Sequence, residues 1–403
     1  MEGMTLSQPG VVRGRVVTPE AVVEDGVVVH DGDAIRWVGA VGEAPAELAE
    51  VAARAVPHEG FVLPGLVDLH CHGGGGASFP DALDAETART AVGEHLRHGT
   101  TSVVASLVTA EPAVLRERTV LLAGLAEAGE IAGIHFEGPF IAAERCGAQN
   151  PAGIREPDPE LTAELLELGR GHVVTMTVAP EAPGVDDVVR VLARGGALPS
   201  FGHTVASAAR AGQAVREATE LLASAPSARS ARATVTHLCN GMNPMHHREP
   251  GPIPEFLAAA ARGQLVLELI ADGTHLDPHL VRAFFEIAGR ENIALVTDAM
   301  AAAGMPDGDY QLGSLAVTVS DGVARLTGGT SIAGGTAHLI DVVRTTVAGG
   351  VRLVDAVYAA ATSPAAVLGD ETIGALAPGR RADILLTDED LRPVRVIRKG
   401  TAL

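Results

Sequence analysis

The chain has 403 residues, which is enough for a barrel of about 250 residues and a smaller companion domain. Apolar residues make up 47% and charged residues 20%, a composition that is typical of globular proteins and excludes a mainly disordered chain. The formal net charge of −20 argues against nucleic acid or an anionic membrane as a partner, because the protein's own field repels a polyanion. An anionic substrate would need a local cluster of cations.

The cysteine count and the N-terminal sequence indicate in which cellular compartment the protein is expected. Three cysteines form no even set for a disulfide framework, and a chain of this size needs none. Residues 1–5 have neither the basic start nor the apolar core of a signal peptide. No apolar run reaches the roughly 18 residues of a membrane span. We therefore expect a soluble protein in the reducing cytoplasm, with no membrane partner.

The two ends of the chain have the character of short strands. At the start of the chain, β-branched runs are separated by Asp-Gly pairs, which are hairpin signals, and residues 382–386 and 394–397 have the same character. The two ends are predicted to pair in one small β-sandwich domain, with residues 1–58 as its first part and 376–403 as its second.

The middle of the chain, residues 59–375, alternates apolar runs with Ala-, Leu-, Glu- and Arg-rich segments of helical period. This pattern is typical of repeated βα units around a parallel sheet, so we predict an α/β protein with a (β/α)₈ TIM-like catalytic barrel. The eight runs expected to form strands are residues 61–69, 101–108, 131–136, 173–178, 197–201, 233–238, 265–270 and 293–297.

Helices are expected to follow several of these strands. Three good helix candidates are residues 85–97, 111–128 and 278–289. Residues 304–327 break the rhythm with strand-like stretches and turns, which indicates a hairpin insertion after the eighth strand. Helices are predicted to resume at residues 337–347 and 353–361.

The predicted strand ends are unusually rich in titratable side chains. In a (β/α)₈ barrel the chemistry lies at the C-terminal ends of the strands, so such residues are expected there. Six of the eight ends carry them, namely His70 and His72, His135 and Glu137, His203, His237, Asp272 and His275, and Asp298. Histidine and carboxylate ligands together suit Zn²⁺ or another borderline divalent ion, which takes three protein ligands and keeps one open position for a catalytic water.

These residue types at these positions indicate hydrolysis. Glu137, His203 and His237 could supply the three ligands. The His-X-His pair after the first strand points to one side of that strand and could hold a second ion. Asp298 could take a proton from a metal-activated water and deliver it to a leaving group. The set therefore predicts cleavage of an amide-like bond.

Each of these residues also has a structural interpretation. Taken alone, His203 would more often be a satisfied core or loop histidine, and Asp298 could cap the loop after it. Their co-occurrence at strand ends favours a metal site. The glycine run at 73–76 resembles a phosphate cradle but lacks a GKS/T ending, so we interpret it as a flexible loop. Histidines away from the strand ends are expected to be surface or structural residues: His30, His58, His95, His98 and His172.

Several motifs resemble a known family. Pro-Gly-Leu-Val-Asp-Leu-His-Cys-His at 64–72 and Pro-Gly-Arg-Arg-Ala-Asp at 378–383 mark the amidohydrolase superfamily. His-Phe-Glu-Gly-Pro-Phe at 135–140 and His-Leu-Cys-Asn-Gly-Met at 237–242 are narrower and resemble the N-acetylglucosamine-6-phosphate deacetylases. Shorter matching blocks lie at 202–204, 248–251, 271–275 and 297–299. The likeness spans nearly the whole chain.

The resemblance implies a ligand set and a base. Glu137, His203 and His237 would ligate the principal metal, and Asp298 would act first as general base and then as acid. The His-X-His pair, His70 and His72, matches members that have a second metal position, so one or two ions are implied. Zn²⁺ is expected, with Fe, Mn, Co or Cd as alternatives.

The resemblance also implies a phosphosugar substrate and a homodimer. Substrate contacts would come from Ala148, Gln149, Asn240, Gly241, Arg248, His275, Ile332, Ala333 and Gly334, some of them across the dimer interface. Arg248 can bind a phosphate in bidentate fashion while His275 adds a donor. The alternative for Arg248 is a surface ion pair with Glu249 or another acid.

The chain departs from the family pattern in its substrate loops. Where many members have Lys-Gly-Ala-His, residues 146–149 read Cys-Gly-Ala-Gln, so a sugar contact from His would come from Gln149. The expected reaction is removal of the acetyl group from N-acetyl-D-glucosamine 6-phosphate, giving D-glucosamine 6-phosphate and acetate in amino-sugar catabolism. The alternatives are deacetylation of the galactosamine epimer, a cyclic amidase, a deaminase or an N-acyl-amino-acid hydrolase, and a non-catalytic metal-binding scaffold.

Overall fold

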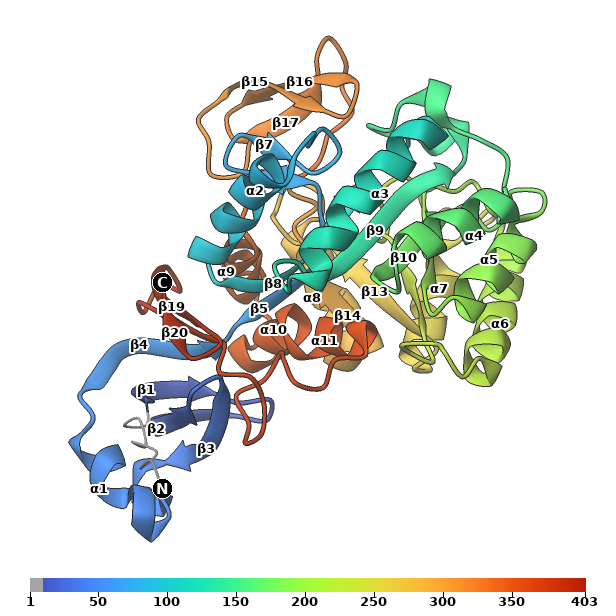
Figure 1. Ribbon diagram of the computed structural model, residues 1–403. Coiled ribbons are helices and arrows are strands. Elements are labelled where there is room, and N and C mark those ends of the chain that lie inside the picture. The colour runs from blue at the N-terminus through green and yellow to red at the C-terminus, as the bar shows by residue number, and fades with distance from the viewer. Residues whose placement is uncertain (1–9) are drawn as a thin grey trace, which may run out of the picture.

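The predicted βα units form a closed parallel barrel. The computed structural model describes residues 10–403, so the signal-peptide prediction for residues 1–5 lies outside the described residues (Figure 1). The barrel strands in spatial order are β5 (Leu66–Cys71), β8 (Thr100–Leu107), β9 (Gly133–Phe140), β10 (Val173–Val178), β11 (Leu198–Phe201), β12 (Ala233–Val235), β13 (Leu265–Leu269) and β14 (Ile293–Leu295). The circle closes through a parallel bridge between Cys71 and Ala299. The predicted (β/α)₈ barrel is therefore confirmed.

The first predicted strand is divided in the structure. Instead of one strand over 61–69, β4 (Pro57–Pro64) belongs to a second sheet and β5 belongs to the barrel. Gly65 separates them, and a Cβ at this position would collide with the side chains of Thr101 and Asp383. Only glycine allows the chain to pass this close to two neighbouring segments, so the break depends on tertiary contacts.

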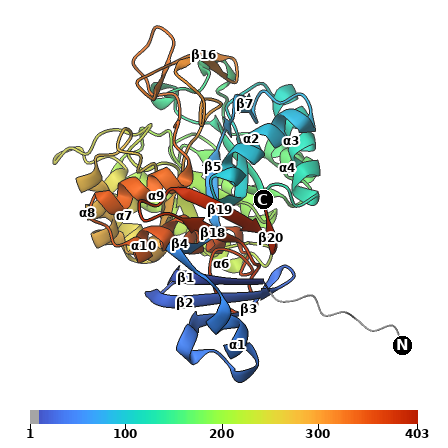
Figure 2. The same ribbon diagram turned by 90° about the vertical axis from the view of Figure 1, so that its left-hand side faces the viewer.

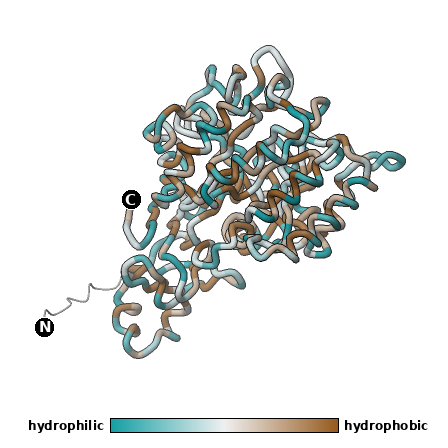
Figure 3. Tube along the Cα trace, turned by 45° about the vertical axis from the view of Figure 1, so that its right-hand side comes forward, coloured by the Kyte–Doolittle hydropathy of each residue, from teal (hydrophilic) through white to brown (hydrophobic). Residues whose placement is uncertain are grey.

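Ten helices within residues 10–403 surround the barrel; seven connect one barrel strand to the next, and the last three come after β14. They are α2 (Ala85–Arg97), α3 (Pro112–Glu127), α4 (Pro159–Leu168), α5 (Val185–Arg194), α6 (Ala208–Ser224), α7 (Ile253–Ala261), α8 (Pro278–Ala288), α9 (Leu339–Ala348), α10 (Leu353–Ala360) and α11 (Thr362–Leu368). In α5 the buried residues Val185, Val188, Val189 and Leu192 recur at helical spacing and form the face that packs on the barrel. Apolar and polar stretches alternate along the helices accordingly (Figure 3).

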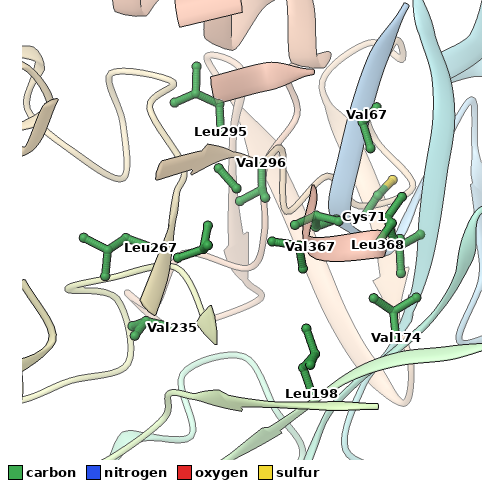
Figure 4. Close-up of a cluster of buried hydrophobic side chains, with 14 of the residues drawn as sticks. Val67, Cys71, Val174, Leu198, Val235, Leu267, Leu295, Val296, Val367 and Leu368 are labelled. Atoms are coloured by element: carbon green, nitrogen blue, oxygen red, sulfur yellow. The ribbon is translucent and has the colours of Figure 1, made fainter. Parts of the chain in front are cut away.

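Apolar side chains of the barrel strands and of the last helix form one buried core. Figure 4 shows Val174, Leu198, Val235 and Leu267 gathered in one cluster with Val367 and Leu368, among other residues. The last two belong to the final helix, α11, so the end of the barrel domain helps to close its core. Of the described helices, none is both long and apolar enough to cross a bilayer.

Strands from both chain ends form a single seven-stranded sheet. Its order is β20 (Thr401–Ala402), β19 (Pro393–Arg398), β18 (Ile384–Thr387), β4, β1 (Gly10–Val17), β2 (Val22–Asp31) and β3 (Ala34–Ala40). The predicted pairing of the two ends is confirmed, because β18 lies antiparallel to β4. Figure 2 shows β1–β3 of this sheet below the barrel, with α1 (Ala46–Arg54) beneath them. The domain boundaries at 58 and 376 stay predictions, and β4 runs through the first of them.

An inserted sheet lies at the other end of the barrel. β15 (Gly308–Leu312), β16 (Leu315–Ser320) and β17 (Val323–Leu326) form three antiparallel strands where a hairpin was predicted, and they stand opposite β1–β3 in both views (Figures 1 and 2). The remaining short elements are β6 (Gly73–Gly74), β7 (Ala77–Ser78) and the 3₁₀ turns Val41–Glu43, Ala143–Arg145, Pro151–Gly153 and Arg290–Asn292.

Packing of α7 on the barrel predicts a large effect of one core substitution. The rings of Phe256 in α7 and Phe201 in β11 are nearly parallel with centroids 6.0 Å apart, and both side chains are buried. We expect Phe256→Ala to lower the free energy of unfolding by about 3–5 kcal/mol, because the ring leaves a cavity behind. Denaturation in urea followed by circular dichroism measures the change. Ile287→Ala, at an exposed position of α8, is the control and should change little; equal losses in the two variants would contradict this account of the packing.

Candidate active site

Four side chains that are far apart in the sequence meet at one mouth of the barrel. Glu137 lies in β9, whereas His203, His237 and Asp298 come directly after β11, β12 and β14. The Oε1 atom of Glu137 is 2.8 Å from Nε2 of His203 and 2.8 Å from Nε2 of His237. The ligand atoms of these three residues all lie within 4.8 Å of one another. The structure thus brings together the residues that the sequence predicted as principal metal ligands.

A second group shares Glu137 with the first. The Oδ1 atom of Asp298 is 3.3 Å from Nε2 of His70 and 3.2 Å from Nε2 of His72. The Oε2 atom of Glu137 lies 3.1 Å from Nε2 of His72, and the four ligand atoms of this group also lie within 4.8 Å of one another. Glu137 therefore stands between the two groups, with one carboxylate oxygen facing each.

Unusual backbone conformations direct three of these side chains. His203, His237 and Asp298 have φ values of 46°, 27° and 49°, in the left-handed region that non-glycine residues rarely adopt. Each such conformation costs about 1–3 kcal/mol and persists only where the surrounding structure imposes it. All three lie just past a strand end, where the chain must turn away from the barrel while the side chain stays in the mouth.

The cluster is buried, and its charges compensate one another. Burial raises the pKa of Glu137, but the neighbouring imidazoles of His70, His203 and His237 lower it to well below its usual range. Burial lowers the pKa of His72, but Asp298 and Glu137 raise it to about 8. The carboxylates are thus ionised, and positive charge on the imidazoles offsets them in the absence of a metal.

The donor atoms fit a divalent cation. The Nε2 atoms of His70 and His72 are 3.1 Å apart and point at each other, which requires a proton or a cation between them. The ring nitrogen Nδ1 of His237 is buried without a hydrogen-bond partner among residues 10–403. Imidazole nitrogens and carboxylate oxygens at this spacing are the donor set that Zn²⁺ and similar ions take.

Three buried polar residues around this cluster had no role predicted from the sequence. Glu268, in the middle of β13, places Oε2 3.1 Å from Nδ1 of His70. Asp68 accepts a 2.6 Å hydrogen bond from the Thr297 hydroxyl next to Asp298. His135 points into the barrel interior, where its Nε2 atom lies 2.9 Å from Oγ1 of Thr177. The sequence signal that could have identified them is a single polar residue inside an apolar run.

A cavity of about 240 Å³ opens above the cluster. Several of the predicted substrate residues line it, namely Ala148, Gln149, Asn240, Gly241, His275, Ile332 and Gly334. Leu312 and Ser331 complete the side formed by the inserted sheet and the loop after it. Two predicted residues lie elsewhere: Ala333 is fully buried behind the lining, and Arg248 is exposed on the segment 243–250.

Two lining residues are held by neighbouring groups. The Gln149 side chain donates a hydrogen bond to Oε2 of Glu137 and accepts one of 2.7 Å from the Thr109 backbone N–H. Nδ1 of His275 is 2.8 Å from Oδ2 of Asp272. Burial lowers the pKa of His275, but the Asp272 carboxylate raises it above its usual value. Along this lining, within the described part of the chain, there is no lysine or arginine.

The barrel and the ligand geometry define a metal-dependent hydrolase of the amidohydrolase class, and comparison with known proteins agrees. A family model described as the amidohydrolase family matches residues 61–403. N-acetylglucosamine-6-phosphate deacetylase of Bacillus subtilis is 35% identical over 327 residues, which are 78% of this chain and 76% of that protein. N-acetylgalactosamine-6-phosphate deacetylase of Escherichia coli is 31% identical over 396 residues, 96% of this chain and 97% of that protein. The chain belongs to the amidohydrolase family.

A solved structure gives the resemblance more detail. N-acetyl-D-glucosamine-6-phosphate deacetylase of Mycobacterium smegmatis, a mutant in complex with N-acetyl-D-glucosamine-6-phosphate, is 37% identical and matches with a TM-score of 0.88. The match covers 98% of this chain and 99% of that chain. The predicted likeness to the N-acetylglucosamine-6-phosphate deacetylases is therefore confirmed.

Proposed function

We propose that this protein hydrolyses the acetamide of N-acetyl-D-glucosamine 6-phosphate to D-glucosamine 6-phosphate and acetate. The observation that carries the proposal is the convergence of Glu137, His203, His237 and Asp298 beside a cavity of about 240 Å³ at one mouth of the barrel. The relatives named above, which act on N-acetylhexosamine 6-phosphates, supply the substrate class.

In this proposal Glu137, His203 and His237 hold the principal ion, while His70 and His72 form a second position beside it. We propose Zn²⁺, because imidazole and carboxylate donors suit it, with Fe, Mn, Co or Cd as alternatives. A bound ion supplies Lewis-acid polarisation of the amide carbonyl and lowers the pKa of water to about 7.

Asp298 is the proposed general base and then acid. Burial raises its pKa, but His70 and His72 lower it to below its usual value, so the group is a carboxylate at neutral pH. A carboxylate in this position can take the proton from the attacking water and deliver it to the departing amine nitrogen. The fixed backbone at φ 49° holds the side chain in the mouth for both transfers.

Among residues 10–403, the cavity lining offers the phosphate His275 but no lysine or arginine. Arg248 and Met245 both lie on the exposed segment 243–250. We propose a homodimer in which Arg248 of the partner subunit reaches the phosphate, while His275 binds from within the chain. The Arg-to-phosphate bond would be charge-assisted and bidentate.

We further propose a cytoplasmic location. None of the three cysteines forms a disulfide, and the substrate is a charged sugar phosphate. The galactosamine epimer is the second candidate substrate, because the Escherichia coli relative that covers 96% of this chain is a deacetylase of N-acetylgalactosamine 6-phosphate.

Metal removal and a substrate panel test the proposal directly. The protein stripped with a chelator is expected to release no acetate from N-acetylglucosamine 6-phosphate, and reloading with Zn²⁺ should restore release. The ratio kcat/KM should be higher for this compound than for its galactosamine epimer and lowest for the unphosphorylated sugar. Full activity in protein that elemental analysis shows to be metal-free would contradict the metal's role, and equal kcat/KM values with and without the phosphate would contradict the substrate class.

Substitution of the proposed base separates chemistry from metal binding. Asp298→Asn keeps the shape of the side chain but cannot accept the proton, so kcat should fall by roughly 10²–10⁴ while the ion at Glu137, His203 and His237 stays bound. Steady-state assays and elemental analysis measure the two quantities. Asp277→Asn, which alters the N-cap of α8 outside the cavity, is the matched control and should behave as wild type. Near-normal turnover in Asp298→Asn would exclude Asp298 from proton transfer.

Mixing two impaired variants tests the contact across the dimer. Arg248→Ala should raise KM for the phosphorylated substrate, because a charge-assisted hydrogen bond worth about 1.5–3 kcal/mol is lost. In a mixed dimer of Arg248→Ala and Asp298→Asn chains, one site combines an intact Asp298 with an intact Arg248 of the partner subunit. Activity of the mixture above that of either variant alone is therefore expected. If the mixture shows no gain, Arg248 does not serve the neighbouring site.

A further inference from the structure

Glu268 is a buried carboxyl group in an otherwise apolar strand. It lies in β13, within the run Leu265–Leu269, and its side chain has no solvent exposure. Its Oε1 atom has no hydrogen-bond partner anywhere in residues 10–403. A buried carboxyl group with an unpaired oxygen destabilises a fold relative to an apolar side chain of the same size. Its presence therefore calls for a compensating role.

The contacts of Glu268 lead to the proposed metal ligands. The Oε2 atom lies 3.1 Å from Nδ1 of His70 and 3.4 Å from the backbone nitrogen of His237. The backbone carbonyl of Glu268 accepts a 2.9 Å hydrogen bond from the backbone N–H of Leu238, the residue after His237. Glu268 itself does not line the cavity and lies outside both ligand groups. It thus acts on the cluster through other residues.

The contact with His70 determines which ring nitrogen faces the cluster. A carboxylate oxygen can only accept, so Nδ1 of His70 carries a proton towards Glu268, and Nε2 is the nitrogen whose electron pair can go to a cation. Nε2 is the atom that lies 3.3 Å from Oδ1 of Asp298 and 3.1 Å from Nε2 of His72. Carboxylate partners of this kind fix the orientation of a ligating imidazole and increase its basicity.

The other imidazoles of the cluster lack such a partner. Nδ1 of His72 lies 3.2 Å from the Ser106 carbonyl oxygen, and Nδ1 of His203 lies 2.7 Å from the Arg145 carbonyl oxygen. Nδ1 of His237 has no partner within the described part of the chain. Among these four imidazoles, a carboxyl group thus supports only His70, in the second metal position.

We propose that Glu268 is a positioning residue that makes the His70–His72 position a binding site for a second divalent cation. The proposal rests on the proposed metal-dependent function, which already contains the second ion, and deepens it: the affinity of that ion depends on the Glu268–His70 hydrogen bond. Outer partners of this kind change metal affinity by about 10–100-fold when they are removed.

Titration of the full-length, chelator-stripped protein with Zn²⁺ tests the proposal. Wild type should bind two ions, and Glu268→Leu should weaken the second by about 10–100-fold while leaving the first unchanged. Glu268→Gln keeps an oxygen that accepts from Nδ1 and should show a smaller loss. Glu94→Gln is the matched control, because Glu94 is also a buried glutamate bonded to a histidine, His338, but lies outside the cavity. Both affinities should be unchanged in it.

Thermal melting of the metal-free proteins separates positioning from a structural role. Glu268→Gln should melt at the wild-type temperature while it binds the second ion more weakly, because it keeps an oxygen that accepts from Nδ1 of His70. A lower melting temperature with both Zn²⁺ affinities unchanged would overturn the proposal, as would a wild-type protein that binds one ion with an affinity that Glu268→Leu leaves unaltered. Failure of the deacetylase function itself would show differently, as absence of acetate release from the fully loaded wild-type protein.

Discussion

Two buried carboxylates dominate the chemistry at one end of this molecule. Glu137 and Asp298 are 3% and 8% exposed, and in a site of low polarity their charge must be balanced locally. Four imidazoles from the ends of three strands do this, and each is held by a contact behind it or by a strained backbone. The eight-stranded barrel makes the arrangement possible, because it brings all its strand ends to one mouth and can hold their side chains rigidly.

A second cluster in the same protein shows what distinguishes a site from a structural clamp. Glu94, His98 and His338 also place their ligand atoms within 4.8 Å of one another. There, however, Oε1 of Glu94 is 2.9 Å from Nε2 of His338, its other oxygen pairs with Arg97, and Nδ1 of His338 faces Asp341. Arginine already supplies the positive charge, and these polar atoms are partnered. The cluster therefore ties α2 to α9, whereas the cluster at the barrel mouth has two ring nitrogens, on His70 and His72, that face each other.

Sequence reasoning succeeded where position along a strand determines position in space. Parallel strands bring their C-terminal ends together, so Glu137, His203, His237 and Asp298 could be grouped before any contact was known. It failed where a contact between distant segments determines where a strand ends. The break at Gly65 arises from its closeness to Thr101 and Asp383, which no local pattern contains.

Glu268 was missed for a related physical reason. Both faces of a parallel strand are buried, so its apolar run shows no alternation that tells which residue points into the barrel. A lone carboxyl group in such a run is nevertheless informative, because burial without full pairing is unfavourable and is tolerated only where it serves something else. In this barrel the unpaired carboxyl oxygen destabilises β13, and the hydrogen bond from the same carboxyl group orients His70 on the other side of the interior. Glu268, the residue least favourable to the stability of this strand, thus contacts the residues that we propose for the chemistry.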